Sequence, residues 1–360
     1  FIFNHSPIIT LFPITSNIYL MILIILSSGC LPVESTSEYM APVSMVSRSV
    51  VSVNLSLHEK WRISNLFIPH RDTSTIYSNG DFLFYVAHDN NGRTSWLSVI
   101  DTTSGSMLWK SDSLPFSENS LAVDERRLFL ALSAKILAYD LFTGDVLWET
   151  QERLPDRTQY KMYAKDDHLI VYSAEDSAPE NTMQIVRVYD SRSGILESIK
   201  SETISQDASY LLKTNTNDYW TDRTAIWSID NQTKQQKWSM LIDGPVQYQP
   251  LLIGNKLVFA SGIFSDVTAI DNDTGNQVWK YSERIISNLT MESGIIYAIR
   301  EDAAVVAINL FTGEELGYIT VTPGFTEESG SRVKSYLVAA ANGMVFAYYG
   351  DSQELIAFSK

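Results

Sequence analysis

Short apolar runs separated by tight polar turns recur along most of the chain. Asn-Gly and Gly-Asn pairs that stand between such runs are strong signals for β-hairpins. No segment shows a sustained hydrophobic period of about 3.6 residues, which predicts very little helix. The pattern therefore predicts an all-β chain. The clearest of these turns are Asn79-Gly80, Gly254-Asn255 and Asn342-Gly343.

A longer pattern repeats every 38 to 50 residues. A β-branched run is followed by Asp, two variable residues, Thr-Gly and, four residues after the glycine, Trp. Repeats of this length are typical of arrays in which each copy is one small structural unit. The Asp position holds Asp101, Asp140, Asp190, Asp230, Asp271 and Asn309. The Gly position holds Gly105, Gly144, Gly194, Gly275 and Gly313, and the Trp position holds Trp109, Trp148, Trp238 and Trp279.

A seventh copy is divided between the two ends of the chain. Leu355–Ser359 matches the strand before the turn, and Leu57–Trp61 matches the strand after it. Residues 57–360 divided among seven copies give about 43 residues each, the length of a four-stranded propeller blade. The sequence therefore predicts one domain over 57–360, a seven-bladed β-propeller of four-stranded antiparallel blades. We expect the N-terminal strand, which carries Trp61, to complete the last blade and close the ring.

The repeated residues have structural roles in this prediction. The Asp carboxylate can accept backbone N–H groups within its own turn, and the glycine supplies a positive φ. A tryptophan on the fourth strand is large enough to wedge between neighbouring blades. Two copies depart from the pattern, because Ser198 and Gly317 stand at the Trp position. We expect looser packing between blades at these two points.

The repeat Ala-x-Asp-x-x-Thr-Gly-x-x-x-Trp resembles that of the PQQ-like, quinoprotein-type β-propellers. The resemblance covers essentially all of residues 57–360 and implies the propeller fold. Quinone-dependent dehydrogenases of this kind are larger and carry two adjacent cysteines over the cofactor. This chain has a single cysteine, Cys30, outside the predicted propeller. We therefore expect no quinone and no other cofactor.

The first 30 residues are predicted to be an export signal. No charged residue precedes Glu34, and Ile18–Leu26 is an unbroken apolar run. The sequence Ser27-Ser28-Gly29-Cys30 resembles a bacterial lipoprotein processing site, which implies acylation of Cys30. A plain secretory signal or a single anchor helix are the alternatives. Residues 31–56 are rich in Ser, Val and Pro and are predicted to be a flexible tether. The predicted location is the bacterial cell envelope, with a lipid anchor in the membrane.

Composition excludes several classes of function. The chain has 42 acidic and 27 basic residues, so its formal net charge is −15. An acidic surface repels phosphate backbones, so no nucleic acid is expected as a partner. One cysteine excludes an intramolecular disulfide and any cysteine-cluster metal site. The five histidines show no H-E-x-x-H pairing, and no metal site is predicted.

Candidate binding residues lie in three segments on the side of the ring opposite the Asp turns. These segments are 88–94, 174–182 and 322–332, and loops on a rigid scaffold often carry function. The alternative interpretation is that they are ordinary solvated loops. The residues are His88, Arg93, Glu175, Asp176, Glu180, Glu327 and Glu328.

The leading hypothesis is a non-catalytic module that binds another envelope protein or acts as a scaffold. In its predicted cellular location and in its type of repeat, the chain is similar to the BamB-type lipoproteins of outer-membrane protein assembly. One alternative is an enzyme, which predicts converging carboxylates or an Arg/His pair at the mouth of the central channel. The other is a sensor of carbohydrates or other small ligands, which predicts exposed aromatic residues there, with Trp96 and Trp220 as candidates.

Overall fold

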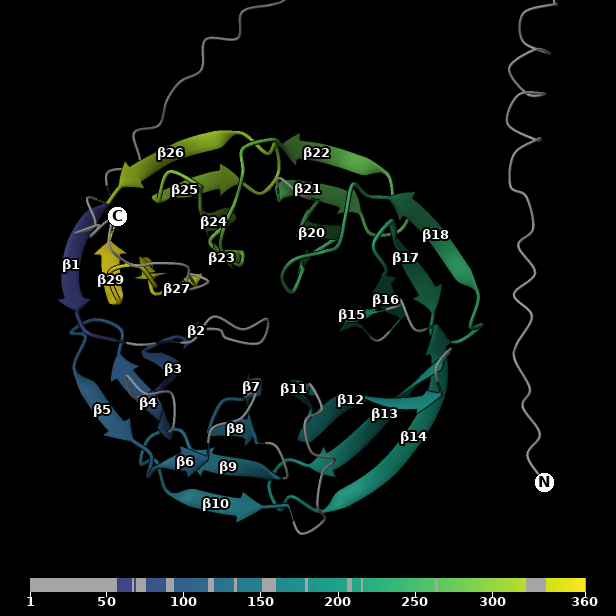
Figure 1. The fold of residues 1–360 in the computed structure, drawn as a ribbon, viewed down its shortest axis with the longest axis horizontal. Helices are drawn as coiled ribbons and strands as arrows, with labels where there is room; N and C mark the ends of the chain where they lie inside the picture. Colours follow the sequence, from purple (N-terminus) through teal and green to yellow (C-terminus); the bar gives the residue numbers. More distant parts are fainter. Residues whose placement is uncertain are drawn as a thin grey trace, which may run out of the picture. The chain divides into compact units, whose positions relative to one another are not determined.

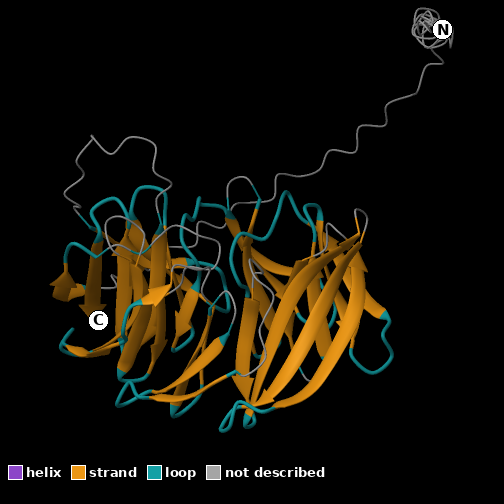
Figure 2. Ribbon diagram, turned by 60° about the horizontal axis from the view of Figure 1, so that its bottom comes forward, coloured by secondary structure: helices purple, strands orange, loops and turns teal. Residues whose placement is uncertain are grey.

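A computed structural model describes residues 57–66, 68, 76–88, 94–115, 120–132, 135–150, 160–178, 181–205, 209–214, 216–262, 265–321 and 335–359. The predicted signal segment and tether, residues 1–56, lie outside this range, and so does Cys30. The described residues form strands and turns only, as Figure 2 shows. No helix among them has the length and apolar character needed to cross a membrane. The all-β prediction is confirmed.

Seven antiparallel sheets make up the propeller, and each is a meander of four strands. Blade 1 has β2 (Ile76–Asn79), β3 (Phe82–His88), β4 (Thr94–Asp101) and β5 (Met107–Lys110), and the short β6 (Leu114–Pro115) also pairs with β4. Blade 2 has β7 (Ser120–Val123), β8 (Arg127–Ala131), β9 (Ile136–Asp140) and β10 (Val146–Glu149). Blade 3 has β11 (Tyr160–Lys165), β12 (His168–Ala178), β13 (Asn181–Asp190) and β14 (Leu196–Ser205).

The remaining blades follow the same plan. Blade 4 has β15 (Ser209–Lys213), β16 (Asn217–Thr221), β17 (Ala225–Asp230) and β18 (Gln236–Leu241). Blade 5 has β19 (Leu251–Ile253), β20 (Lys256–Ser261), β21 (Asp266–Asp271) and β22 (Gln277–Tyr281). Blade 6 has β23 (Thr290–Glu292), β24 (Ile295–Ile299), β25 (Ala304–Asn309) and β26 (Glu315–Thr320). Blade 7 has β27 (Tyr336–Ala341), β28 (Met344–Tyr349), β29 (Glu354–Ser359) and β1 (His58–Ile63).

The blades are arranged in a ring, with the first strand of each blade innermost and the fourth outermost (Figure 1). The predicted seven-bladed β-propeller is therefore confirmed. In blade 7 the outermost strand comes from the start of the described chain, since β1 pairs antiparallel with β29 and His58 lies opposite Ser359. The two ends of the propeller sequence thus meet in one sheet.

One extra residue enters the fourth strand of every blade near the start of that strand, which in blades 1 to 6 is just after the Asp turn. In blade 1, Trp109 lies opposite Val99 while Met107 lies opposite Ile100, so Leu108 is the additional residue. The same shift occurs in the other six blades. Such a bulge increases the local twist of an edge strand and re-aims its side chains. Here it sets the face on which each tryptophan lies.

The hydrophobic core is divided among the seven junctions between neighbouring blades. Each junction contains one cluster of buried apolar side chains. The cluster between blades 7 and 1 has 15 buried residues, whereas that between blades 3 and 4 has two among the side chains described there, Tyr172 and Trp220. Several side chains of β12 to β15 lie outside the described part, so the loosening beside Ser198 stays a prediction. The loosening predicted beside Gly317 is wrong, because the junction of blades 6 and 7 keeps 13 buried residues.

The segment 174–182, predicted as a loop, is largely β-structure. Strand β12 continues to Ala178 and β13 begins at Asn181. Residues such as Glu175 and Asp176 have low β-propensity, but they extend a ladder in which β13 is already paired on both sides. The prediction is corrected accordingly: blade 3 has the longest strands of the ring.

Candidate functional site

Each of five repeat tryptophans lies against the Asp turn of the next blade. Its indole N–H donates a hydrogen bond to the carbonyl of the residue that follows the Asp. The distances are 3.0 Å for Trp61 to Thr102, 2.9 Å for Trp109 to Leu141, 3.0 Å for Trp148 to Ser191, 2.8 Å for Trp238 to Asn272 and 2.9 Å for Trp279 to Leu310. The tryptophan therefore joins two blades by a directional bond as well as by packing.

The turn glycine is required for this contact. A Cβ added to Gly144 would lie 2.6 Å from Cδ2 of Trp109, and its φ of 77° is one that L-residues rarely adopt. Gly105, Gly194, Gly275 and Gly313 show the same approach, at 2.6 or 2.7 Å from their tryptophans. The Gly of one repeat and the Trp of the preceding blade thus form one structural unit.

The two blades that lack the repeat tryptophan, at Ser198 and Gly317, also face a neighbouring blade that lacks the turn glycine. The turn that Ser198 would face carries Lys234 instead of glycine, with a φ of 57°. Gly317 lies on the outer strand of blade 6 and would face blade 7. The third and fourth strands of blade 7 come from opposite ends of the chain and share no Asp turn. Wherever the tryptophan is missing, the glycine that would receive it is missing too.

The repeat carboxylates are engaged inside their own turns. Asp271 Oδ1 accepts hydrogen bonds from Thr274 Oγ1 and Thr274 N, each at 2.9 Å, and from Asp273 N at 3.1 Å. These bonds hold the pKa of the Asp271 carboxyl below its usual value, with the hydroxyl of Thr274 as the largest cause. Asn309 makes the equivalent bond with an amide oxygen, to Phe311 N at 2.8 Å. The uncharged amide of Asn309 thus accepts the same turn hydrogen bond as the Asp carboxylates do. The negative charge is not needed for this bond, so the Asp side chains at this repeat position have a structural role.

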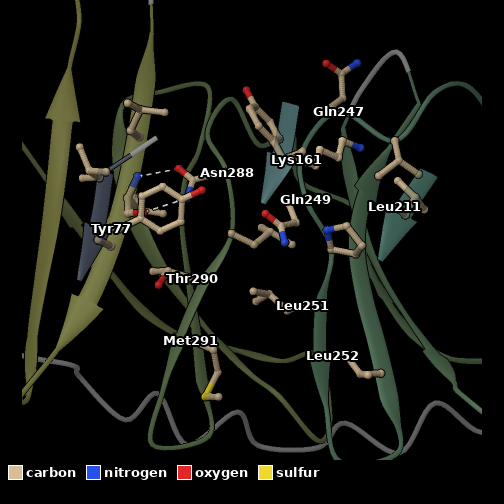
Figure 3. Close-up of a pocket in the computed structure, with 18 of the residues that line it drawn as sticks. Tyr77, Lys161, Leu211, Gln247, Gln249, Leu251, Leu252, Asn288, Thr290 and Met291 are labelled. Carbon is tan, nitrogen blue, oxygen red and sulfur yellow. Dashed lines mark hydrogen bonds between the residues drawn. The ribbon is translucent and has the colours of Figure 1, made fainter. Parts of the chain in front are cut away.

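A central pocket of about 910 Å³ is lined by the innermost strands and the segments that precede them. Figure 3 shows Lys161 and Gln247 towards one end of the pocket, Gln249 near its middle, and Leu252 and Met291 towards the other end. In a four-stranded meander the first strand starts on the side opposite the turn between strands three and four. The polar end therefore lies near the connections between blades, on the face opposite the Asp turns.

Lys161 on β11 is the charged side chain that stands out in this pocket. The residue as a whole is exposed, but neighbouring groups of the pocket displace part of the water around its ammonium group, and this desolvation lowers its pKa to about 8. On the opposite wall, Asn288 pairs with the backbone of Val338, donating to its carbonyl and accepting from its N–H, each at 2.8 Å (Figure 3). This side-chain amide joins blades 6 and 7 as a backbone group would.

The candidate binding residues lie at the limit of the described structure. The backbone of His88 ends β3, and Glu175 and Asp176 belong to β12, but their side chains are outside the described part. Arg93, Glu180, Glu327 and Glu328 fall outside it entirely. The binding role assigned to these residues stays a prediction.

The aromatic residues that line the pocket are tyrosines, among them the partly exposed Tyr77, Tyr248 and Tyr336, whereas the predicted Trp96 and Trp220 are not among its described lining residues. Among its described lining residues Asp222 is the one carboxylate, and it accepts hydrogen bonds from its own turn, at 2.6 Å from Thr224 N. Trp220 is 6% exposed and packs between blades 3 and 4, and Trp96 lies under the Lys110 ammonium, 3.6 Å from the ring centre. No group of three metal-ligating side chains occurs in the described ranges.

The sequence analysis did not predict the residues that line this pocket. One indication of them is present in the sequence, since the charged Lys161 interrupts the apolar run Tyr160-Lys161-Met162-Tyr163 of an inner strand. Its meaning depends on the closed ring, which brings first strands from all the blades around one cavity.

The ring of seven meanders and the Trp-to-turn contacts define a β-propeller built from PQQ-like repeats. A family model described as "Outer membrane protein assembly factor BamB" matches residues 93–226 and 205–359, well over half of the sequence, and the chain belongs to this family.

Individual relatives match shorter segments. The BamB of Burkholderia pseudomallei strain K96243 is 37% identical over 90 residues, 22% of this chain and 23% of the relative. That of Francisella salina is 32% identical over 65 residues, 18% of this chain and 12% of the relative. The matches thus span less than a quarter of the length of these relatives.

Two solved structures share the fold. BamB from Moraxella catarrhalis aligns with a TM-score of 0.50 at 13% identity and covers 84% of this chain and 100% of that one. The computationally designed Ika8 protein aligns with a TM-score of 0.55 at 12% identity and covers 82% and 98% of the two chains. At such identities the likeness concerns the fold alone.

Proposed function

We propose that this protein is a non-catalytic binding module of the cell envelope that takes part in outer-membrane protein assembly. The observation that carries the proposal is the match of the BamB family model across residues 93–359 of the propeller. A rigid ring of small sheets offers large surfaces and many loops for protein contacts.

Apolar side chains on the outer rim support a binding role. Met107 and Leu108 on β5, and Val146 and Leu147 on β10, are exposed, with Val146 at 55%. Phe142, in the turn before β10, is equally exposed. Exposed apolar patches on soluble domains commonly mark interaction surfaces. The outer strands of blades 1 and 2 are therefore suited to contact another protein.

Export and anchoring are part of the proposal. The apolar run Ile18–Leu26 would direct export, Cys30 would receive the lipid, and residues 31–56 would link it to the ring. Expressed in a bacterial host with an added initiator methionine, the chain should incorporate labelled palmitate. Cys30→Ser should abolish the label while the propeller still folds. Equal labelling of both proteins would exclude Cys30 as the acylated residue.

The binding role is tested by capture from cells treated with a reversible crosslinker. The full chain with a C-terminal tag should recover outer-membrane assembly proteins, identified by mass spectrometry. The same tag on an unrelated exported lipoprotein is the control. Recovery of the same proteins at the same level with both baits would overturn the proposal.

A second candidate function is the binding of a small ligand in the central pocket. The observation in its favour is the group of polar side chains, Lys161, Gln247 and Gln249, that line a cavity of about 910 Å³. Such a ligand would carry an anionic group for the lysine. Protection of Lys161 from chemical modification by a small carboxylate or phosphate compound would support this function.

A further inference from the structure

The central pocket is bordered by strand edges as well as by side chains. The first strand of every blade is the last strand on its side of the sheet, so one of its two edges has no neighbouring strand. In an antiparallel pair the N–H and C=O of alternate residues point to the partner strand, and those of the residues between point away. The residues that point away bring backbone donors and acceptors to the pocket. Such groups take a side chain, water or a ligand as their partner.

Side chains of neighbouring blades supply this partner along the inner edge of blade 7. Asn288 donates to the carbonyl of Val338 and accepts from its N–H, each at 2.8 Å. Ser78 Oγ donates to the carbonyl of Ala340 at 2.8 Å. Val338 and Ala340 are two residues apart on β27, as the alternation requires. An amide and a hydroxyl are therefore groups that pair well with an inner edge of this ring.

The inner edges of blades 5 and 6 lack such side-chain partners. Ile253 and Glu292 each precede a two-residue turn and pair with the first residue of the second strand. The residues before them, Leu252 and Met291, therefore point their N–H and C=O away from the second strand. Both line the pocket, and among the described residues no side chain bonds to these backbone groups. They are available to a ligand.

The connection between blades 4 and 5 adds polar and aromatic side chains to the same wall. Gln249 is exposed and lines the pocket, and its amide both donates and accepts (Figure 3). Tyr248 is half-buried, and its hydroxyl donates to the carbonyl of Ile286 at 3.0 Å, which holds the ring beside the cavity. The lining residues of this wall, 245–253 and 288–291, include no charged side chain.

We propose that this wall, residues 245–253 and 288–291, binds a short neutral oligosaccharide. Each sugar hydroxyl both donates and accepts, so it can bond to the free strand edges and to the Gln249 amide. The C–H face of a sugar ring would pack against Tyr248. The absence of charge on this wall favours a neutral polar ligand, because an ion would lose hydration there without gaining a counter-ion.

The size of the cavity agrees with this ligand class. Its volume of about 910 Å³ lies within the range of small-ligand pockets, roughly 300–1,000 Å³. The proposed activity goes beyond the protein-binding role. It also differs from the binding of a small anion at Lys161, because it uses another wall of the pocket.

The probes are three series of neutral sugars, based on maltose, cellobiose and N,N′-diacetylchitobiose, each with two to four sugar units. Saturation-transfer NMR with the full chain detects binding, and isothermal titration gives the dissociation constant. We expect saturable binding of at least one series. Sodium acetate, an anion without hydroxyl groups, should not displace the sugar.

Hydrogen exchange at single-residue resolution locates the bound sugar. The amides of Leu252 and Met291 should exchange at least threefold more slowly with the sugar present, because its hydroxyl oxygens accept from them. The amides of Leu251 and Ile253 are bonded to β20 and should not change. This measurement needs no substitution, so it does not depend on the folding of a variant.

A pair of glutamine variants tests the side-chain contribution. Gln249→Ala should weaken sugar binding roughly fivefold or more, because it removes a donor and an acceptor from the wall. Gln232→Ala removes an exposed glutamine from the Asp turn of blade 4 and is the matched control. It should bind the sugar as the wild type does. Thermal melting establishes that both variants are folded.

Three outcomes would overturn the proposal. They are no binding of any of the sugars, unchanged exchange at Leu252 and Met291 in the presence of a bound sugar, and equal binding by Gln249→Ala and Gln232→Ala. If acetate or phosphate protects Lys161 while no sugar binds, the pocket is an anion site and the oligosaccharide proposal falls. Capture of assembly proteins from crosslinked cells tests the protein-binding role separately, so the two can fail independently.

Discussion

Trp148 shows how one side chain joins two blades. Its ring is buried against Gly194, and its indole N–H donates to the carbonyl of Ser191 in blade 3. Burial of a ring of this size contributes several kcal/mol, and a hydrogen bond adds about 1 kcal/mol. Packing therefore supplies most of the stabilisation, and the bond fixes the orientation.

Replacement of Trp148 separates these two effects. Trp148→Ala should lower the free energy of unfolding by about 3–5 kcal/mol, because it leaves a cavity between blades 2 and 3. Trp148→Phe keeps part of the packing and loses the N–H donor, so its loss should be smaller. Chemical denaturation measures both. An unchanged midpoint for the alanine variant would contradict the packing argument.

Lys161 is expected to titrate near pH 8. Its folded pKa is lowered from the ordinary value near 10.5 by desolvation, so the ammonium form is disfavoured in the folded protein. The unfolded chain binds the proton more tightly, and stability should therefore rise as pH increases from about 8 to about 10.5. Lys161→Met should remove this rise.

Chemical modification provides a direct measurement of the same property. A small amine-acylating reagent at pH 7.5 should modify Lys161 faster than the surface lysines, because a larger fraction of its amine is neutral. Peptide mass spectrometry at short reaction times gives the rates. Lys60 is an exposed reference. Equal rates at both lysines would show that the pocket does not perturb Lys161.

At the scale of elements, the Asp turn of blades 1, 2, 3, 5 and 6 is the part that contacts the tryptophan of the preceding blade. Asp140 accepts backbone N–H groups of Phe142 and Thr143 at 2.9 Å, which shapes the turn. Gly144 then provides the flat surface on which Trp109 rests. The turn thus has an internal requirement for a carboxylate or amide and an external requirement for glycine.

Two glycine substitutions separate the backbone strain at a turn glycine from the close contact with the tryptophan. Gly144 and Gly80 both have a positive φ, but an added Cβ would meet Trp109 at Gly144 and nothing within 4 Å at Gly80. Gly80→Ala should cost about 1 kcal/mol from backbone strain alone. Gly144→Ala should cost clearly more, since the indole must move as well. Equal losses in urea denaturation would show that the close approach is unimportant.

Sequence predicts some of these elements better than others. The hairpin turns and the Asp turns depend on neighbouring residues, so Asn79-Gly80 and Asp140 could be interpreted directly. The Trp109–Gly144 contact joins residues in two successive repeats, and a repeat considered alone assigns each a separate role. The length of β12 was missed because strand pairing overrides the low propensity of Glu175 and Asp176.

At the scale of the whole molecule, the ring is held by seven junctions of unequal size. Among the described residues, the junction between blades 3 and 4 has two buried side chains and lacks the hydrogen bond from a repeat tryptophan to the Asp turn, whereas the junction between blades 7 and 1 has 15 buried residues and that bond from Trp61. The central pocket exists because the ring brings first strands from all blades together. Neither property belongs to a single repeat, which is why the periodic pattern predicted the ring but not the pocket.

A role in outer-membrane protein assembly is tested most directly by the abundance of correctly assembled outer-membrane proteins. It is quantified in purified outer membranes from cells of the source organism with and without the gene. We expect a lower abundance in cells without the gene, restored by the wild-type chain and not restored by a chain lacking its propeller residues. The same abundance in all four strains would contradict a role in outer-membrane protein assembly.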